Sequence, residues 1–540
     1  MSHETLDALT LELVLTRVIS AADEAAEALK RSSFSTLVTE SNDLAIVVTD
    51  TGGRLIGQST ESIPAFIGTL PITVKHVLSV FGDDLKEGDL IATNDPWTGS
   101  GHLNDISLVR PVFRGGRLTC IAASCAHAPD IGGRGRSLES RELYEEGFMI
   151  PPLKILRGGV VDETFFALYR ENSRTPGESE GDVWAGINAL ASVERRIGRI
   201  LDDYGLDDLD AVAREINRRS ELAMRKAISA VPDGVYRHRL LTDGFEVPLS
   251  LEVAVTVAGD RIGVDFTGSS AAVPRAINCP ITYTFAMTAY ALKSLLLPDL
   301  PNCEGPLSCL NVAAPAGSIV NPIRPSAVAG RVAVGQYLPP LIFAALAPVL
   351  PERVMAMPGS PLWSCVLNYR SSEGRPATAT LFFNGGMGAT AHNDGEPCYS
   401  WPSNVSNVPV EIVEARSPLR INYKRLVPGS GGRGRRRGGL GQEISMTALD
   451  DAVTVKLLAE RCRQPAEGLL GAGDGQVGAV RINGVEIDVR VDHLLHAGDE
   501  LSIRTPGGGG LGPVSERAAI DVERDRMMGY VPPSNAEDRT

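Results

Sequence analysis

Two β-type runs joined by a pair of glycines place the strongest constraint on how this chain can fold. The runs DISLVRPVFR and RLTCIAASCA flank Gly115-Gly116, which suits a two-residue hairpin turn that needs positive φ angles. Counting back from that turn pairs Asp105 with Ala126 and Asn104 with His127. In this strict register Asp105 and His127 point to opposite faces of the sheet. Their joint use in one site requires the strand ends to leave the regular pleat, which the surrounding glycines and prolines permit.

The predicted hairpin brings together two short motifs in a chain that has only eight histidines. One motif is GHLND, with His102 three residues before Asp105, and the other is HAPD, which begins at His127. Two imidazoles and one carboxylate suit a borderline divalent ion such as Zn, Mn, Fe or Ni, and they leave coordination positions open for water or substrate. The alternatives are acid–base catalysis and histidines that only cap glycine-rich turns. His102, Asp105 and His127 are therefore candidate metal ligands.

Two further carboxylates are candidates for the same site. Asp43 begins the apolar run DLAIVV and is either a turn residue or a fourth, carboxylate ligand. Asp130 is a candidate catalytic residue, because a carboxylate there could orient a ligating histidine or act as a general base. The alternative for Asp130 is an Asx-turn before Ile131-Gly132-Gly133.

Apolar periodicity predicts an α+β fold class: a multi-layer mixed fold with antiparallel β-hairpins, a long helical hairpin and a β-rich C-terminal region. Two long helices, at 183–204 and 208–230, are separated by Gly205 and are expected to form that helical hairpin. The other expected elements are a helix over 4–31, a hairpin over 43–58, a helix over 71–82, strands over 235–270, helices near 284–297 and 335–350, and strands from about 375.

The same pattern divides the chain into five regions. We expect an N-terminal α+β region with the metal-site hairpin (1–180), the helical hairpin (181–232), a central α/β region (233–370), a β-rich region (371–515) and a tail (516–540). The final PPSNAEDRT is expected to be disordered.

Glycine-rich segments in the second half invite a nucleotide-binding interpretation, which their details do not support. GSGGRGRRRGGLG (429–441) lacks the GK[ST] that completes a phosphate-binding loop. We predict a solvated loop between strands, with contact between its arginines and an anionic substrate or partner as the alternative. PGGGGLG (506–512) is likewise expected to be a loop.

Composition excludes several classes of function. A net charge of −14 and 5% aromatic residues argue against nucleic-acid binding. The most apolar run, LPPLIFAALAPVL, is too short and too proline-broken to span a bilayer, so no membrane association is expected. The eight cysteines form no CxxC pair and follow no secretory signal, which predicts reduced core thiols and a cytoplasmic protein.

Long segments of the chain resemble the hydantoinase B / oxoprolinase family. They include GDLIATNDPWTGSGHLNDISLVRPVF, AHAPDIGG, ELYEEGFMIPPLKI, VDFTGSSAAVPRAINCPIT, PVEIVEARSPLRI, SGGRGRRRGGLG and TPGGGG, in order from about residue 10 to 515. The resemblance implies a subunit of an ATP-dependent hydrolase of cyclic amides or of a related acetone or acetophenone carboxylase. It implies an A-type partner that binds ATP and Mg and phosphorylates the substrate, while this subunit holds a divalent metal ion (Zn, Mn or Fe). The family's ligands then fall on His102, Asp105, His127 and Asp43.

One segment departs from the family pattern. Many members carry two histidines in an HIPxHLG-like segment, where this chain has Ser62 and Phe66 in SIPAFIG. The first expectation is therefore the metal-bearing subunit of a cyclic-amide hydrolase. The alternatives are a subunit of a ketone carboxylase and a scaffolding subunit that has lost catalysis.

Overall fold

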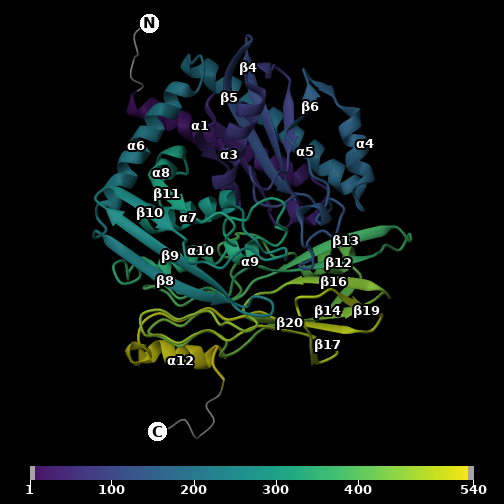
Figure 1. Cartoon of the computed structure of the whole chain (residues 1–540), viewed down its shortest axis with the longest axis vertical. Coiled ribbons are helices and arrows are strands. Elements are labelled where there is room, and N and C mark those ends of the chain that lie inside the picture. Colours follow the sequence, from purple (N-terminus) through teal and green to yellow (C-terminus); the bar gives the residue numbers. More distant parts are fainter. Residues whose placement is uncertain (1–6, 533–540) are drawn as a thin grey trace.

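The computed structural model describes residues 7–532, which form a mixed α+β molecule with four β-sheets (Figure 1). The N-terminal sheet and its helices lie at one end, the C-terminal strands lie at the other, and the central part of the chain lies between them. The predicted fold class is confirmed. The prediction of a disordered PPSNAEDRT concerns mainly residues outside the described part of the chain.

The N-terminal sheet is buried on both faces. Its order is β2-β1-β5-β4-β3-β6-β7, and its strands are β1 (Leu44–Thr49), β2 (Leu55–Gln58), β3 (Leu90–Thr93), β4 (Asp105–Arg114), β5 (Arg117–His127), β6 (Leu153–Arg157) and β7 (Val160–Val161). Side chains alternate between faces along a strand, so Leu44 and Ile46 join one core while Ala45 and Val47 join another.

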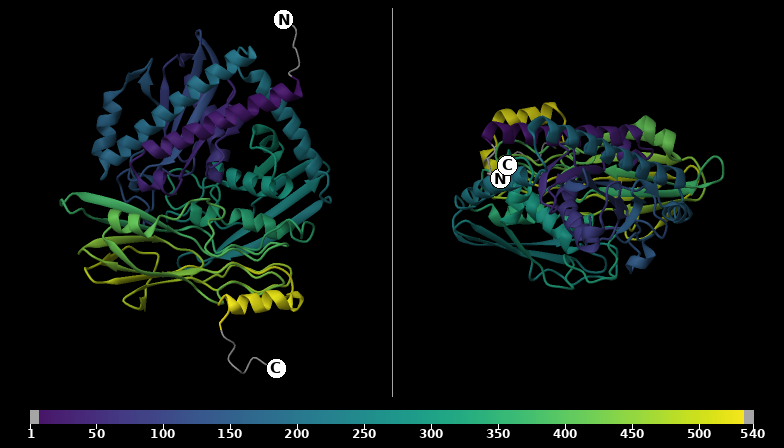
Figure 2. Two further views of the ribbon diagram at one scale, coloured as in Figure 1. Left: turned by 180° about the vertical axis from the view of Figure 1, so that it is seen from behind. Right: turned by 90° about the horizontal axis from the view of Figure 1, so that it is seen from above.

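Helices cover both faces of this sheet. On one face lie α1 (Ala8–Ser32) and α5 (Pro176–Tyr204), which run side by side, as Figure 2 shows from behind. On the other face lies α3 (Pro64–Phe81), packed against α7 (Ile281–Leu296). In the described part of the chain, Pro64–Asp84 is the one helix long and apolar enough to cross a membrane, and here it packs between the sheet and α7. It begins earlier than the predicted residue 71, because Pro64 occupies the first turn and Pro71 is tolerated inside the helix.

The expected helical hairpin does not form, although both of its helices exist. Gly205 has a left-handed conformation and ends α5 as predicted, and α6 (Asp210–Ile228) follows. However, α5 packs against α1 and the sheet, whereas α6 packs against α8 (Glu304–Ser308), α1 and β2. Each helix therefore buries its apolar stripe against other elements instead of against its neighbour in sequence.

The central region packs helices on a second sheet. Its order is β11-β10-β9-β8, with β8 (Gly234–Thr242), β9 (Leu249–Ala258), β10 (Arg261–Asp265) and β11 (Leu310–Ala313). The helices α7, α9 (Val332–Gly335) and α10 (Leu338–Leu346) fill the space between this sheet and α3. One core cluster therefore joins the N-terminal and central regions.

Two further sheets form the C-terminal region around their own core. One has the order β13-β12-β16-β19, with β12 (Trp363–Arg370), β13 (Pro376–Phe383), β16 (Val453–Leu458) and β19 (His493–Leu495). The other has the order β14-β15-β20-β17-β18, with β14 (Leu419–Leu426), β15 (Gln442–Ala448), β17 (Ala479–Ile482), β18 (Val485–Glu486) and β20 (Glu500–Arg504). The domain boundaries stay predictions. The boundary predicted at residue 370 falls between β12 and β13, which pair with each other in one sheet.

Both glycine-rich segments are loops, as predicted, but they are mostly buried and interlocked, so the prediction that 429–441 is solvated is wrong. Gly438 lies so close to Gly508 that an added Cβ at Gly438 would stand 1.9 Å from the Gly508 carbonyl oxygen. The segments also bond to one another, since Gly439 donates to Met387 O at 2.7 Å and Gly508 donates to Gly439 O at 3.0 Å. Only glycine permits such close approach of backbones, which explains the composition of these segments.

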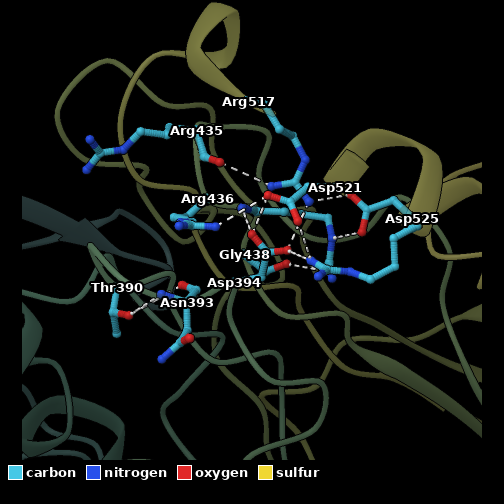
Figure 3. A network of polar contacts seen from close by, with 11 residues as sticks. Thr390, Asn393, Asp394, Arg435, Arg436, Gly438, Arg517, Asp521 and Asp525 are labelled. Atoms are coloured by element: carbon cyan, nitrogen blue, oxygen red, sulfur yellow. Dashed lines mark hydrogen bonds and ion pairs between the residues drawn. The ribbon is translucent and has the colours of Figure 1, made fainter. Parts of the chain in front are cut away.

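The arginines of the same segment bind the C-terminal helix α12 (Ala519–Met527), as Figure 3 shows. Arg437 Nε lies 3.3 Å from Asp525 Oδ1, and Arg517 bridges Asp525 at 2.6 Å and Asp394 at 2.8 Å. Residues 519–527 of the predicted tail therefore form an ordered helix held by ion pairs.

All eight cysteines are free thiols, and six of them are buried. The predicted core location is confirmed for these six.

Candidate metal centre

The hairpin β4–β5 places Asp105 directly opposite His127. Gly115 and Gly116 have φ angles of 57° and 77°, so the predicted glycine turn is confirmed. The predicted pairing of Asp105 with Ala126 is wrong, because a β-bulge at Thr119 shifts the register by one residue. The bulge turns Asp105 and His127 to the same face, so neither strand has to leave the pleat.

Asp43 completes a row across three neighbouring strands. It directly precedes β1, and its carbonyl oxygen accepts a hydrogen bond from His127 N at 3.1 Å. Because β1 and β4 flank β5, Asp43, His127 and Asp105 project from the same face of the sheet, toward α3 and α7. Asn104, expected opposite His127, instead accepts from Ala128 N at 2.7 Å.

His102 reaches the same point from the loop between β3 and β4. Its Nδ1 lies 3.0 Å from Ala329 O, and its Nε2 lies 2.8 Å from Asp105 Oδ1. His127 Nδ1 lies 2.8 Å from the same oxygen and 3.9 Å from Asp43 Oδ2. The structure thus brings together all four residues proposed as ligands, and ligand atoms of His102, Asp105 and His127 lie within 4.8 Å of one another.

The protonation of His102 follows from its surroundings. Burial and the adjacent Arg331 guanidinium lower the pKa of His102 to about 3, so the ring is neutral at pH 7. A carbonyl oxygen only accepts hydrogen bonds, so the single ring proton lies on Nδ1, facing Ala329 O. Nε2 therefore carries a bare lone pair, lies 2.8 Å from Asp105 Oδ1 and makes no hydrogen bond.

The two oxygens of Asp105 have different surroundings. Oδ2 accepts from Ser100 Oγ at 2.5 Å and from Arg331 Nη2 at 2.6 Å, whereas Oδ1 faces the two imidazoles. Burial alone raises the pKa of Asp105, but the adjacent Arg331 guanidinium and the hydrogen bond from His127 hold it well below its usual range. Burial raises the pKa of Asp43, against the opposing influence of His127.

These surroundings fit a metal ion. A buried carboxylate oxygen and a buried imidazole lone pair repel each other at 2.8 Å unless a cation or a proton lies between them. Carboxylate oxygen and imidazole nitrogen are ligands that Zn, Mn and Fe accept. The hydrogen bonds from His102 to Ala329 and from Arg331 to Asp105 are of the kind that orients metal ligands.

Comparison with known proteins now identifies the family. A sequence profile of the hydantoinase B/oxoprolinase family matches residues 7–514. The chain belongs to this family. It is 29% identical to the B-type component of a putative D-/L-hydantoinase from Pseudomonas sp. strain NS671, over 97% of this chain and 93% of that protein.

Two solved structures share the fold of this hydantoinase B/oxoprolinase family member. The crystal structure of an ATP-dependent caprolactamase from Pseudomonas jessenii matches with a TM-score of 0.90 and 28% identity, over 98% of this chain and 95% of that chain. Nucleotide-free acetone carboxylase matches with a TM-score of 0.89 and 18% identity, over 98% of this chain and 78% of that chain.

The candidate metal centre of this family member opens on a cavity where three regions of the chain meet. The N-terminal sheet contributes the cluster, the central region contributes Tyr283, Met287 and Arg331, and the C-terminal region contributes Phe382 and Val405. Sequence reasoning missed Arg331 and another buried arginine of the lining, Arg136. No local signal marks either one, because Arg331 reaches Asp105 from 226 residues away.

The structure does not bring Asp130 into this cluster. Its carboxylate accepts hydrogen bonds from the backbone and side chain of Arg174, with Arg174 Nη1 at 2.7 Å from Oδ1. Asp130 does not line the cavity, and the oxygen beside His127 Nδ1 belongs to Asp105.

The two positions that depart from the family pattern lie in different surroundings. Phe66 is fully buried and forms part of the cavity wall. Ser62 hydrogen-bonds to Ser59 Oγ at 2.6 Å and lies outside that lining.

Proposed function

We propose that this chain is the metal-bearing subunit of an ATP-dependent hydrolase that opens a cyclic amide of hydantoin, 5-oxoproline or lactam type. The observation that carries the proposal is the buried cluster itself, in which His102 Nε2, which makes no hydrogen bond, and His127 Nδ1 both lie 2.8 Å from Asp105 Oδ1. Two imidazoles and one carboxylate suit Zn, Mn or Fe, with Asp43 as a further ligand.

The side chains around the cluster have separable tasks. Ala329 O fixes which nitrogen of His102 faces the ion, and Ser100 and Arg331 hold Oδ2 of Asp105 so that Oδ1 remains for ligation. When bound, a divalent ion supplies Lewis acidity toward a carbonyl and lowers the pKa of a water molecule. Phe66 and its apolar neighbours keep other water away from the reacting carbonyl. Asp130, through Arg174, holds the chain that follows His127.

We further propose that ATP and Mg bind an A-type partner subunit. The sequence has no GxxxxGK[ST] loop, and the hydantoinase relative from Pseudomonas sp. is named as one subunit of its enzyme. The partner would phosphorylate the amide oxygen, which makes the carbonyl carbon a better electrophile. The substrate would then react in the cavity of this chain.

Hydrolysis is favoured over carboxylation by the closer relatives. The caprolactamase structure is 28% identical to this chain, whereas the acetone carboxylase structure, at 18%, shows only a shared fold. A scaffolding subunit is the remaining alternative, and an intact ligand set argues against it.

The test is ATP-dependent turnover by the full chain co-expressed with an A-type subunit from the same genome. Hydantoin, 5-oxoproline and caprolactam would each be supplied with and without bicarbonate. The proposal predicts ring-opened product without bicarbonate, and no product with His102→Ala. Product that forms only with bicarbonate would favour the carboxylase, and a complex without metal or turnover would favour the scaffold.

A further inference from the structure

Arg136 is a buried cation without a partner. The residue is 7% exposed, its Nε has no hydrogen-bond partner, and it forms no ion pair with any carboxylate in residues 7–532. The neighbouring group that the structure does supply is the ring of Phe382, with its centroid 5.8 Å from the guanidinium carbon. The guanidinium lines the same cavity as the metal ligands.

The other buried arginines show that this is unusual for the protein. The structure buries five arginines in its described part, and the remaining four are satisfied by protein groups. Arg331 pairs with Asp105, Arg437 with Asp525 and Arg490 with Glu460, while Arg461 donates to Ser360 O at 2.6 Å. Arg136 alone among the five makes neither kind of contact.

An unpaired guanidinium in this position costs stability. Burial and the nearby Arg331 lower the pKa of Arg136 to about 10, so the group remains charged at neutral pH. The carboxylates of Asp43 and Asp105 act favourably on this charge but do not pair with it. A desolvated charge without a paired counter-charge is destabilising, and a second cation nearby adds to the cost. An anion entering the cavity would remove that cost and would gain a planar donor that matches carboxylate and phosphate geometry.

We propose that Arg136 binds an anionic oxygen group of the substrate, next to the metal cluster. The inference rests on the proposed function for the identity of that group, which is the phosphoryl group of the activated amide or a carboxylate. Phe66, Met287, Leu362 and Phe382 line the rest of the cavity, so the preferred substrate has an apolar body and an oxyanion head. Arg136 would place that head so that the carbonyl carbon lies toward Asp105 and the two histidines.

The test compares Arg136→Met with a matched control, Arg141→Met, an exposed arginine nearby in sequence. Inorganic phosphate, acetate and bicarbonate would be titrated calorimetrically into the full chain, as purified and after EDTA treatment. The EDTA arm excludes anions held by a metal ion, and the three probes separate a phosphoryl from a carboxylate preference. We expect Arg136→Met to weaken binding of the preferred anion at least about tenfold, and Arg141→Met to leave it unchanged.

Thermal unfolding separates a ligand-binding role from a structural one. Methionine removes the unpaired charge and leaves an unbranched apolar side chain beside Phe382, so Arg136→Met should unfold at the same or a higher temperature than the wild type without ligand. Stabilisation by the preferred anion should disappear in Arg136→Met and persist in Arg141→Met.

Three results would overturn the inference: no anion binding by the wild type, undiminished binding by Arg136→Met, or loss of folding in that variant. Metal content, measured on the same preparations, tests the proposed function separately. A chain that binds the anion but no metal would contradict the metal site while leaving the role of Arg136 intact.

Discussion

At the scale of single residues, Asp105 connects the two histidines of the candidate site with the buried Arg331. One of its oxygens faces His102 and His127, and the other is held by Ser100 and Arg331. The same carboxylate therefore serves as a ligand and as the counter-charge of a buried guanidinium. The two roles predict two separable effects of one substitution.

Asp105→Asn should both lower metal affinity and destabilise the metal-free protein. The amide removes the negative charge, so Arg331 is left buried without compensation, at a cost of about 3 kcal/mol in the free energy of unfolding. Urea unfolding of EDTA-treated protein measures that cost. Asp130→Asn is the control, because its partner Arg174 lies outside the cavity lining, and it should keep its metal. Unchanged stability of Asp105→Asn would contradict the ion pair.

Glu146 supports the site through the backbone of residues 328–329. Its Oε1 accepts hydrogen bonds from Val328 N at 2.7 Å and Ala329 N at 2.8 Å, and Ala329 in turn positions His102. Burial raises the pKa of Glu146 from 4.5 to about 8, so the folded protein holds a proton that the unfolded chain releases. The free energy of unfolding should therefore fall as the pH rises from about 4.5 to about 8.

Glu146→Gln should remove this pH dependence, since the amide is neutral throughout. The free energy of unfolding of the variant should rise relative to that of the wild type as the pH increases, by up to about 4 kcal/mol at pH 8. Chemical denaturation at several pH values checks the trend, with the exposed Glu142→Gln as the matched control. A constant difference between Glu146→Gln and the wild type across this window would exclude a buried, protonated Glu146.

At the scale of elements, the bulge in β5 decides the site. β4 has 10 residues and β5 has 11, so Asp105 and His127 can face each other only if one residue of β5 is left unpaired. Thr119 is that residue, and its Oγ1 donates to Val112 O at 3.0 Å. The bulge corrects a mismatch in length between the two strands.

Two single-residue deletions test this role of the bulge. Deleting Thr119 equalises the strands, so a regular hairpin should still pair Asp105 with His127 and keep the metal. Deleting Arg114 from the other strand doubles the mismatch, and metal affinity should fall at least about tenfold. Competition with a chromogenic chelator measures the metal affinity of both variants. Equal losses of metal affinity in the two variants would show that the pairing register of β4 and β5 does not position the ligands.

The sequence was informative where local chemistry decides the structure. The glycine turn at Gly115-Gly116, the end of α5 at Gly205 and the proximity of His102, Asp105 and His127 could all be predicted. The bulge could not be predicted, because regular pairing along the two strands was the simplest assumption. Only the requirement that Asp105 and His127 lie on the same face of the sheet reveals that one residue of β5 must stay unpaired. The packing of α5 and α6 depends on distant partners, and so does the approach of Arg331 and Arg136 to the cavity.

At the scale of the whole molecule, the site depends on all three regions of the chain. The cavity takes walls from the N-terminal sheet, from α7 and Arg331, and from the C-terminal segment that includes Phe382. The interlocked glycine segments stabilise the C-terminal region by close backbone packing, and α12 binds to them through ion pairs (Figure 3).

Gly438→Ala should therefore be strongly destabilising. Its Cβ would stand 1.9 Å from Gly508 O, so backbones must separate, at an expected cost of about 3 kcal/mol or more. Gly198→Ala is the control, because this helical glycine has open space around it and the change should stabilise α5 by up to about 1 kcal/mol. Thermal unfolding of both variants checks the contrast. A Gly438→Ala protein as stable as the wild type would contradict the interlocked packing.

The central claim is that His102, Asp105 and His127 hold a divalent ion. The most direct test is elemental analysis of the purified full chain alongside His102→Ala and a control, the exposed His496→Ala. We expect about one Zn, Mn or Fe per chain in the wild type and in His496→Ala, and a loss of most of that metal in His102→Ala, with the fold retained by circular dichroism. Metal-free wild-type protein that cannot be loaded with any of these ions, or His102→Ala with full metal content, would contradict it.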